Sequence, residues 1–345
     1  MNKLVYSEEE LMQSHDYAAP HIEAGHRLHG GFDESGTYAP PRCLVRSPAI
    51  AAWTEALRER GGDWLAADSS LLAGIRYPSA AQNKLLLMEG LDLTFWNTLT
   101  ITGKIEARGR VLADISFPDF QGLVVEDISG MAIGHLNKGL LAAHGIDEGG
   151  ELEKGIGGHD TMWFALRDLA FGETDFPDPE VADNIGRPEQ DATRISQIPL
   201  EYERTVYFLL NLLLIEFRAE RGFAMTETLL LDPDLFTGRR KEAEHAAKIV
   251  DRIRTDEAIH VASLRLYLGE LCSVNFKAVD GGTIPGKDVV DTLWQEIVHW
   301  AIAEQPRLIA EQQKKLMTER ILSHDDGEEI LARFNALEDE ATENP

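Results

Sequence analysis

Apolar residues are grouped along this chain in long stretches that predict helices. The first stretch, residues 80–113, is apolar nearly all round, which is typical of a buried helix. The others cover residues 121–143, 201–231 and 237–276. The Thr-rich residues 98–101 can also be read as a strand, so this alternative stays open. The order helix, helix, long connection, helix, helix predicts an all-α four-helix bundle.

The long connection, residues 145–200, is rich in Gly and Pro and contains one short predicted helix over 160–171. We interpret it as a crossover and not as a separate domain. Asp160 suits the N-cap of the short helix, because its carboxylate can accept from free backbone N–H groups. The glycines at 155–158 follow no predicted strand and precede no Lys-Ser or Lys-Thr, so they do not predict a nucleotide site.

The N-terminal region, residues 1–79, lies outside the predicted bundle of residues 80–276. It is expected to be a largely irregular arm packed on the bundle. A short helix is predicted over 20–28, where Pro20 suits a first turn. A second helix is predicted over 47–60.

The C-terminal region begins with an additional predicted helix within residues 277–324, most of it over 288–322. Residues 325–345 are acidic and are expected to form an irregular, disordered tail.

The clearest chemical signal is the pair Glu257-x-x-His260 in the last helix of the bundle. Residues three apart share one face of a helix, so this carboxylate and this imidazole can contact the same ion. The pairs Glu89/Glu126 and Glu220/Glu257 have the same spacing along the chain. Two helical hairpins that each bring two carboxylates together are what a carboxylate-bridged dimetal site requires.

With this topology and these residues, the stretch 80–276 resembles the ferritin-like, carboxylate-bridged di-iron superfamily. There, two helices each give one Glu and two helices each give a Glu-x-x-His. The resemblance implies that Glu89 and Glu220 are the single ligands of their helices. It implies that Glu126 and Glu257 are the bridging carboxylates and that His260 is a terminal imidazole ligand. It also implies two bound ions, iron or alternatively manganese, as the cofactors.

The sequence departs from the family pattern at Ser129, which stands where a second histidine is expected. His135 lies on the opposite face of the same predicted helix and does not replace it. His159 in the crossover, or the N-terminal arm, can reach the site from outside. Otherwise carboxylates and water ligate that position, or one ion is lost.

The third helix offers Glu216 and Glu227 as alternatives to Glu220. Glu216 lies one turn earlier on the same face, deeper in the apolar block. A carboxylate in an apolar run is costly to bury unless it is paired or binds a metal. The competing interpretation is a set of buried salt bridges to Arg218, Arg221 or Arg254.

Mixed carboxylate and imidazole ligation suits iron or manganese better than zinc. The resemblance then implies a di-iron oxidase or oxygenase that acts with dioxygen on a small, apolar substrate. No catalytic residue is assigned. The alternative function is a non-catalytic helical scaffold or partner subunit that lacks a complete metal site. Iron storage is less favoured, because the large end segments would hinder a shell.

A second group of candidate ligands lies in the N-terminal arm, where Glu23, His26 and His29 are spaced by three residues near His21. It predicts either a separate metal site or a cover for the main one. A polar surface arm explains the same residues, and Gly25 weakens the helix that the site would need.

The formal net charge of -26 and the pI near 4.7 argue against binding nucleic acid or an anionic membrane. No apolar run is long enough for a membrane span, and the N-terminus has no secretory apolar region. Cys43 and Cys272 form no disulfide framework and lack a matched catalytic partner. We therefore expect a cytoplasmic protein whose partner is a small-molecule substrate, with a homodimer as a possible assembly.

Overall fold

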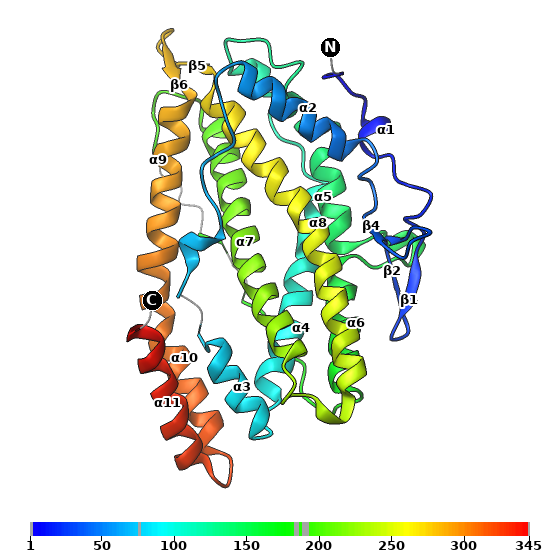
Figure 1. Cartoon of the computed structure of the whole chain (residues 1–345). Helices are drawn as coiled ribbons and strands as arrows, with labels where there is room; N and C mark the ends of the chain where they lie inside the picture. Colours follow the sequence, from blue (N-terminus) through cyan, green and yellow to red (C-terminus); the bar gives the residue numbers. More distant parts are fainter. Residues whose placement is uncertain (1–2, 75–76, 183–185, 188–192, 344–345) are drawn as a thin grey trace.

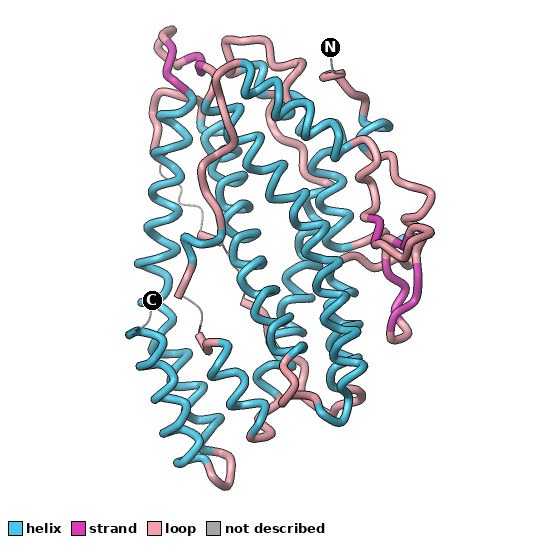
Figure 2. The backbone as a smooth tube through the Cα atoms, in the orientation of Figure 1, coloured by secondary structure: helices cyan, strands magenta, loops and turns pink. Residues whose placement is uncertain are grey.

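The computed structural model describes residues 3–74, 77–182, 186–187 and 193–343, which are mainly helical (Figures 1 and 2). Strands occur in these ranges only as antiparallel two-stranded hairpins. The prediction of a mostly helical chain is confirmed. In the same ranges, no helix has both the length and the apolar character that a membrane crossing requires.

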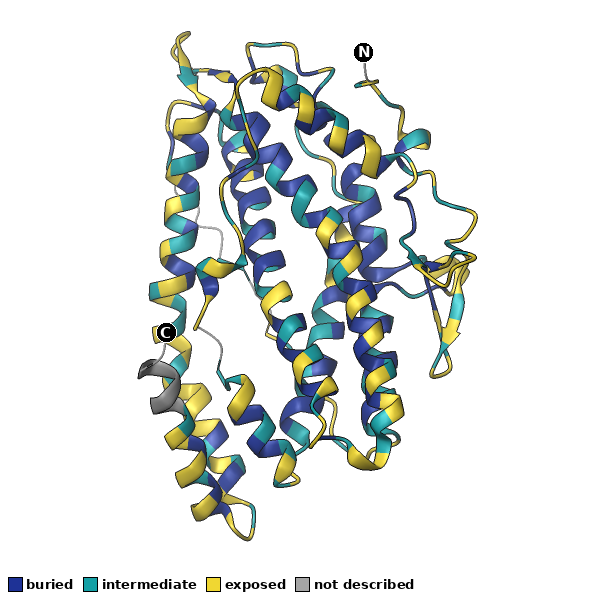
Figure 3. Ribbon diagram, viewed as in Figure 1, coloured by how far each residue is buried: buried dark blue, intermediate teal, exposed yellow. Residues whose placement is uncertain are grey.

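Long helices run side by side through the centre of the molecule (Figure 1). They are α4 (Leu93–Gly109), α6 (His159–Phe171), α7 (Leu200–Leu231) and α8 (Arg240–Cys272). Helix α7 packs along α8, α8 along α6, and α6 along α4, while the short α5 (Leu141–Gly149) packs against α4 and α6. Their facing sides are buried and their outer sides exposed (Figure 3). The core therefore lies inside this bundle.

The first predicted helix, over 80–113, is divided in two. Helix α3 (Ala80–Met88) ends before Gly90, whose φ of 76° lies in the left-handed region that glycine tolerates. Helix α4 then begins at Leu93, and the short 3-10 helix η2 (Arg110–Ala113) continues it. The alternative of a strand over 98–101 is wrong, since these residues are helical.

The prediction of a helix over 121–143 is wrong for most of its length. The chain there forms short turns, namely η3 (Phe120–Gly122), η4 (Ala132–His135) and the π-helical η5 (Leu136–Leu140). Gly139 interrupts η5 with a φ of 94°, so no continuous helix can form. Helix α5 begins only at Leu141 and extends past the expected end, to Gly149.

The helix predicted over 160–171 is α6, which begins at His159 after the 3-10 helix η6 (Leu152–Lys154). It lies inside the bundle, with Trp163 buried against Gly103 of α4 and Phe223 of α7. Gly103 of α4 permits the close contact, because a Cβ there would lie 2.9 Å from the Asp160 carbonyl oxygen. The crossover thus delivers a helix to the centre of the molecule.

Most of the N-terminal arm covers the α6 and α8 side of the bundle, while its last part, around residues 69–72, packs on α7 (Figure 1). It contains α1 (Glu8–Leu11), the hairpins β1 (His21–Glu23) with β2 (His26–Leu28) and β3 (Gly31–Phe32) with β4 (Tyr38–Ala39), α2 (Arg46–Glu59), and η1 (Ser69–Leu72). Helix α2 confirms the helix predicted over 47–60. The helix predicted over 20–28 is wrong, because Ala24 and Gly25 have φ values of 48° and 83° and form the turn of a hairpin.

The remaining elements are η7 (Thr237–Arg239), β5 (Asn275–Lys277), β6 (Thr283–Pro285), α9 (Gly286–His299), the π-helical η8 (Trp300–Glu304), α10 (Gln305–Leu322) and α11 (Gly327–Glu343). Helix α9 packs on α7 and α8, and α11 packs on α10 and α3. We expected an irregular tail where α11 stands. Ile330 and Phe334 explain the helix, since they are buried in one apolar cluster with Leu86 of α3.

Candidate metal centre

Buried carboxylates and imidazoles converge at the centre of the bundle. They come from five helices: Glu106 of α4, His144 and Glu148 of α5, His159 of α6, Glu216 of α7, and Glu257 and His260 of α8. We call these seven side chains the central cluster. All are buried, and two overlapping groups of four have potential ligand atoms within 4.8 Å of one another.

The first half of the central cluster joins α5, α7 and α8. His144 Nε2 lies 3.0 Å from Glu216 Oε1 and 3.2 Å from Glu148 Oε1. The His144 and His260 rings are stacked, with centroids 3.7 Å apart. His260 Nδ1 lies 3.3 Å from Glu148 Oε1 and 3.0 Å from Glu257 Oε2.

The second half joins α4, α6 and α8 around His159. The Nδ1 atom of His159 lies 3.1 Å from Glu257 Oε1, 3.7 Å from Glu148 Oε2 and 4.0 Å from Glu106 Oε2. Glu148 and Glu257 therefore each direct one oxygen to each half. Glu216 and Glu106 each belong to one half only.

Aspartates outside the cluster hold two of its imidazoles by their other nitrogen. His260 Nε2 lies 3.3 Å from Asp147 Oδ2, and His159 Nε2 lies 3.2 Å from Asp256 Oδ2. Such a contact fixes the orientation of an imidazole and makes its inner nitrogen a better metal ligand. Each of these aspartates directly precedes one of the two shared glutamates in sequence.

The N-terminal arm completes this outer layer of contacts. Arg42 and Arg46 donate to the two oxygens of Asp147, at 2.6 and 2.7 Å. Tyr38 donates its hydroxyl to Asp256 at 3.0 Å, and His29 Nε2 lies 3.4 Å from the same oxygen. The arm therefore fixes the centre from the α6 and α8 side.

The donor atoms of the cluster fit a metal ion. His144 Nε2, His159 Nδ1 and Glu257 Oε1 are buried and lie near carboxylate or imidazole atoms, yet they have no hydrogen-bond partner. In the described part of the chain, no Lys or Arg forms an ion pair with any of the four glutamates of the cluster. Buried carboxylates without such cations are costly unless they bind protons or metals. The buried clusters could therefore hold a metal ion.

The electrostatics of the four glutamates divide them into two pairs. Burial raises the pKa of Glu106 and Glu216 well above the usual range, and neighbouring carboxylates add to this. Burial acts in the same direction on Glu148 and Glu257, but contacts with the imidazoles, and with Glu106 for Glu148, outweigh it. The pKa of Glu148 is held well below its usual range and that of Glu257 is lowered to about 2. The two shared glutamates are thus the most strongly anionic.

The structure brings together only two of the five predicted ligands, Glu257 and His260. Glu89 lies beyond the break at Gly90 and pairs with Arg333 of α11, 2.6 Å away. Glu126 lies in a turn outside the bundle and accepts from the backbone and side chain of Asn275. Glu220 is exposed on α7. The assignments of Glu89, Glu126 and Glu220 as ligands are corrected on these grounds.

Two residues that were predicted as alternatives do lie in the central cluster. Glu216, one turn before Glu220, is the α7 residue of the cluster. His159 does reach the centre from the crossover. Ser129 lies in an exposed turn, so the histidine that we expected there is supplied elsewhere, by His144 and His159.

Sequence reasoning missed Glu106, His144 and Glu148. A signal for two of them was present, because His144-x-x-x-Glu148 places both side chains on one helix face in the reverse order of Glu257-x-x-His260. The doublet Asp-Glu also occurs at both places, as Asp147-Glu148 and Asp256-Glu257. Glu106 stands among Lys and Arg residues, a pattern that resembles an exposed helix end.

The second predicted group of ligands in the N-terminal arm does not form a site of its own. Glu23 pairs with Arg252 and His245 of α8, and His26 pairs with Asp168 of α6. Only His29 is buried, next to Asp256 and His159. The arm therefore covers the central cluster, which is the second of the two arrangements predicted for these residues.

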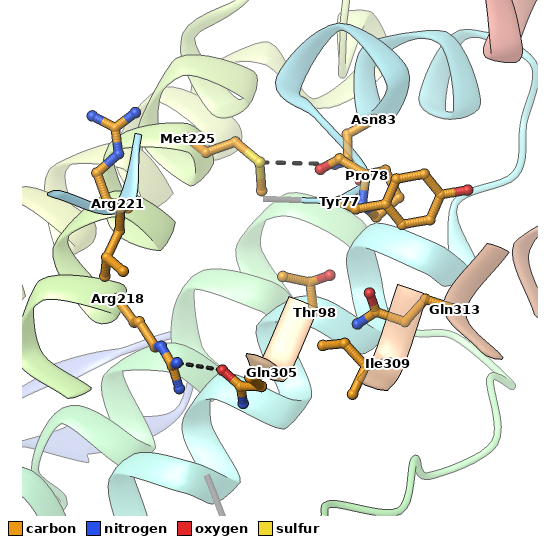
Figure 4. Close-up of a pocket in the computed structure, with 11 residues that line it drawn as sticks. Tyr77, Pro78, Asn83, Thr98, Arg218, Arg221, Met225, Gln305, Ile309 and Gln313 are labelled. Atoms are coloured by element: carbon orange, nitrogen blue, oxygen red, sulfur yellow. Dashed lines mark hydrogen bonds between the residues drawn. The ribbon is translucent and has the colours of Figure 1, made fainter. Parts of the chain in front are cut away.

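Two cavities matter for ligand access. One of about 170 Å³ lies between α4, α5 and α7, and its wall includes Glu106, His144, Glu148 and Glu216. The other, of about 300 Å³, lies between α3, α4, α7 and α10 and contains no member of the central cluster (Figure 4). In it, Arg218 donates to Gln305 and Asn83 contacts the Met225 sulfur (Figure 4).

Comparisons of the chain with protein-family models, curated proteins and solved structures find no match. The interpretation of the central cluster therefore depends on its geometry and chemistry.

Proposed function

We propose that this protein is a metal-dependent oxidoreductase with a ferritin-like core, which holds two ions of iron, or alternatively manganese, in the central cluster. The observation that carries the proposal is the placement of Glu148 and Glu257. Each presents one carboxylate oxygen to each half of the cluster. This is the arrangement that carboxylates adopt when they bridge two ions in a helix bundle.

The side chains divide between the two proposed ion positions. His144, Glu216 and His260 would hold one ion, Glu106 and His159 the other, and Glu148 and Glu257 would bridge them. A set of mostly carboxylate ligands with some imidazole favours iron or manganese over zinc, which takes fewer ligands.

The chain order also supports the resemblance to the ferritin-like superfamily. Helices α4 and α5 precede a long connection, and α7 and α8 follow it. Each of these four helices contributes to the cluster, as the superfamily pattern requires. Helix α6 is an addition to that pattern, because it supplies His159 from within the connection.

When bound, a pair of reduced iron ions supplies reactivity toward dioxygen. The chain's own residues would orient and protect that chemistry. Asp147 and Asp256 hold His260 and His159 in place, and the apolar core around the cluster excludes water. The substrate that we propose is small and apolar, because the cavity beside the cluster is lined mainly by apolar side chains.

The alternative function is a non-catalytic helical scaffold or partner subunit. That hypothesis expects the glutamates first predicted as ligands to pair with arginines or to face solvent. Glu89, which pairs with Arg333, and Glu220, which is exposed, meet this expectation, but Glu257 does not. Among the described residues, Arg254 pairs with Glu227 on the outside of the bundle, and the cluster glutamates pair with imidazoles. This supports a metal-holding function over a scaffold.

The first test is metal content by mass spectrometry on protein from iron-supplemented cells, with two matched variants of α7. We expect roughly two ions per chain in the wild type and in Glu220→Gln, and a clear loss in Glu216→Gln. Thermal unfolding of each variant checks that the fold is retained. A wild type without metal would contradict the proposal, as would equal metal content in both variants.

The second test separates an oxidoreductase from a structural metal protein. The iron-loaded protein is reduced with dithionite under argon, and dioxygen uptake and the optical spectrum are then followed. Rapid uptake that Glu216→Gln loses and Glu220→Gln keeps would support oxidoreductase chemistry. Bound metal with no uptake in the wild type would overturn it.

A further inference from the structure

The cavity beside the central cluster is mostly apolar, whereas the arm side of the cluster is lined by charged and hydrogen-bonding side chains. Four members of the cluster form its inner wall: Glu106, His144, Glu148 and Glu216. The remaining lining residues are Ile105, Arg108, Gly109, Val111, Leu112, Phe208, Leu212, Ile215 and Ala219. Apart from Arg108, none of these carries a polar side chain.

The cavity reaches the surface between α4 and α7. Val111 and Arg108 are exposed at the outer part of the wall, while Phe208 and Leu212 are half-buried further in. Arg108 donates to the Ala182 carbonyl oxygen in the crossover. The passage therefore leads from solvent along apolar side chains to the cluster.

One face of α7 builds much of this wall. Phe208, Leu212, Ile215 and Ala219 recur at helical spacing, and Glu216 lies one turn after Leu212. A molecule between α4 and Leu212 would therefore contact the ligands of both proposed ions. It would meet Glu216 of one and Glu106 of the other.

The opposite side of the cluster is closed by the N-terminal arm and its contacts to Asp147 and Asp256. Those contacts leave the α4 and α7 side as the approach for a reactant. Among the residues that the structure describes, the printed contacts of Glu106 and Glu216 are with imidazoles and carboxylates of the cluster, and none is with an aspartate or an arginine.

We infer that this cavity is the substrate site and that it selects an uncharged, apolar molecule about the size of one benzene ring. An apolar cavity of ~150 Å³ stays dry and binds benzene, so a cavity of about 170 Å³ has the required size. A charged group would lose its hydration among the apolar side chains of the outer wall, and the carboxylates of the inner wall would already be engaged by the proposed ions. This inference rests on the proposed function, since it assigns the substrate of the same site.

The test uses fluorobenzene as the probe and para-fluorobenzylammonium as its charged counterpart, each observed by fluorine NMR with the full chain. Both the iron-loaded and the metal-free protein are titrated. We expect saturable binding of fluorobenzene and none of the ammonium compound by the iron-loaded protein. Binding of both, or of neither, would overturn the inference.

Two variants locate the binding. Leu212→Trp fills the cavity, and Ala219→Leu narrows it if the first variant fails to fold. We expect fluorobenzene affinity to fall at least ~10-fold in either variant, because the space that the ring occupies is removed. Leu231→Trp is the matched control, since Leu231 is exposed at the end of α7 and away from the cavity. Equal affinity in all three variants would place the probe elsewhere and overturn the inference.

Metal content, measured on the same samples, keeps the two proposals distinguishable. Metal without fluorobenzene binding contradicts only the inferred substrate class. Fluorobenzene binding that Leu212→Trp abolishes, in a protein that never takes up metal, contradicts the oxidoreductase and leaves an apolar ligand site.

Discussion

Two adjacent acids in α8 have different functions. Glu257 lies inside the central cluster, while Asp256 lies outside it and contacts His159, Tyr38 and His29. Burial opposes ionisation of Asp256, but contacts with His159 and His29 lower its pKa. Asp256 thus acts through His159, as a positioning residue.

Substitution of Asp256 tests this positioning function. In Asp256→Asn, we expect metal affinity to fall ~10–100-fold, because His159 loses the carboxylate that orients it. Competition against a chelator of known affinity measures the change. Tyr38→Phe is the control, since it removes one donor to Asp256 and leaves the contact to His159. Unchanged affinity in Asp256→Asn would show that this contact is dispensable.

A second buried acid, Glu270 of α8, makes stability depend on pH. Its carboxylate accepts from the backbone of Ala132 and Ile133. Burial raises the pKa of Glu270 from 4.5 to about 7, although the two backbone N–H donors act to lower it. Between these pH values the unfolded chain loses the proton that the folded chain keeps, so stability falls as pH rises.

The size of this effect is roughly 3 kcal/mol across that range, from 1.36 kcal/mol per pKa unit. Urea unfolding of metal-free protein at several pH values measures it. Glu270→Gln should show a shallower decline than the wild type over the same range. Parallel curves for the two proteins would show that Glu270 does not titrate as described.

At the scale of elements, the site depends on how closely α5 approaches the end of α4. Gly145 lies between His144 and Glu148 on α5, and a Cβ there would be 2.4 Å from the Ala113 backbone nitrogen. A real Cβ does not come this close to backbone, so any larger residue must displace the helix that carries both of these side chains.

Gly145→Ala should therefore destabilise the protein by about 1–3 kcal/mol, despite the better helix propensity of Ala, and should weaken metal binding. Chemical denaturation and metal content measure the two effects. The control is Gly238→Ala, where an added Cβ meets nothing within 4 Å. A fully stable, metal-replete Gly145→Ala variant would refute the close-approach explanation.

The elements also show what the sequence could predict. Helices α7 and α8 follow long, uninterrupted apolar patterns, and their predicted ends lie within a few residues of the observed ones. The pairing of equally spaced glutamates failed because Gly90 ends α3 directly after Glu89, and because the chain around Glu126 forms turns in place of a helix. Equal spacing along a chain implies equal position in space only when both hairpins have the same shape.

Membership of the central cluster followed the same division. Glu257 and His260 could be predicted as members because a local helix repeat joins them, and Glu216 was one turn from the first choice. His144 and Glu148 were missed because a single ligand order was sought on both helices. The outer contacts from Tyr38, Arg42 and Arg46 depend on tertiary folding of the arm, which no local pattern encodes.

At the scale of the whole molecule, the central cluster joins five helices that are distant in sequence, and the N-terminal arm is fastened to the same point. Removal of metal should therefore loosen some regions more than others. A ligand at 100 times its Kd stabilises the folded state by ~2.7 kcal/mol. On removal of a bound metal, this stabilisation would be lost mainly in the elements that carry the central cluster.

Hydrogen exchange measured by mass spectrometry tests this expectation. On treatment with a chelator, we expect faster exchange in α5, α6 and the arm, and little change in α10 and α11, whose described residues include no member of the central cluster. The Glu216→Gln variant should already exchange as the chelated wild type does. Uniform acceleration over the whole chain, or none, would contradict a structural link between metal and arm.

The two Asp-Glu doublets have a consequence for how such a protein can change over generations. Asp147 supports His260 on α8, and Asp256 supports His159 on α6, while the glutamate beside each serves the shared centre. In each doublet, two adjacent side chains thus have different functions: the aspartate orients an imidazole, and the glutamate contacts both halves of the central cluster. A substitution of the aspartate in one doublet therefore displaces an imidazole on another helix. A change in a residue next to that aspartate in sequence cannot restore the position of this imidazole. Compensating substitutions should therefore arise as pairs across helices.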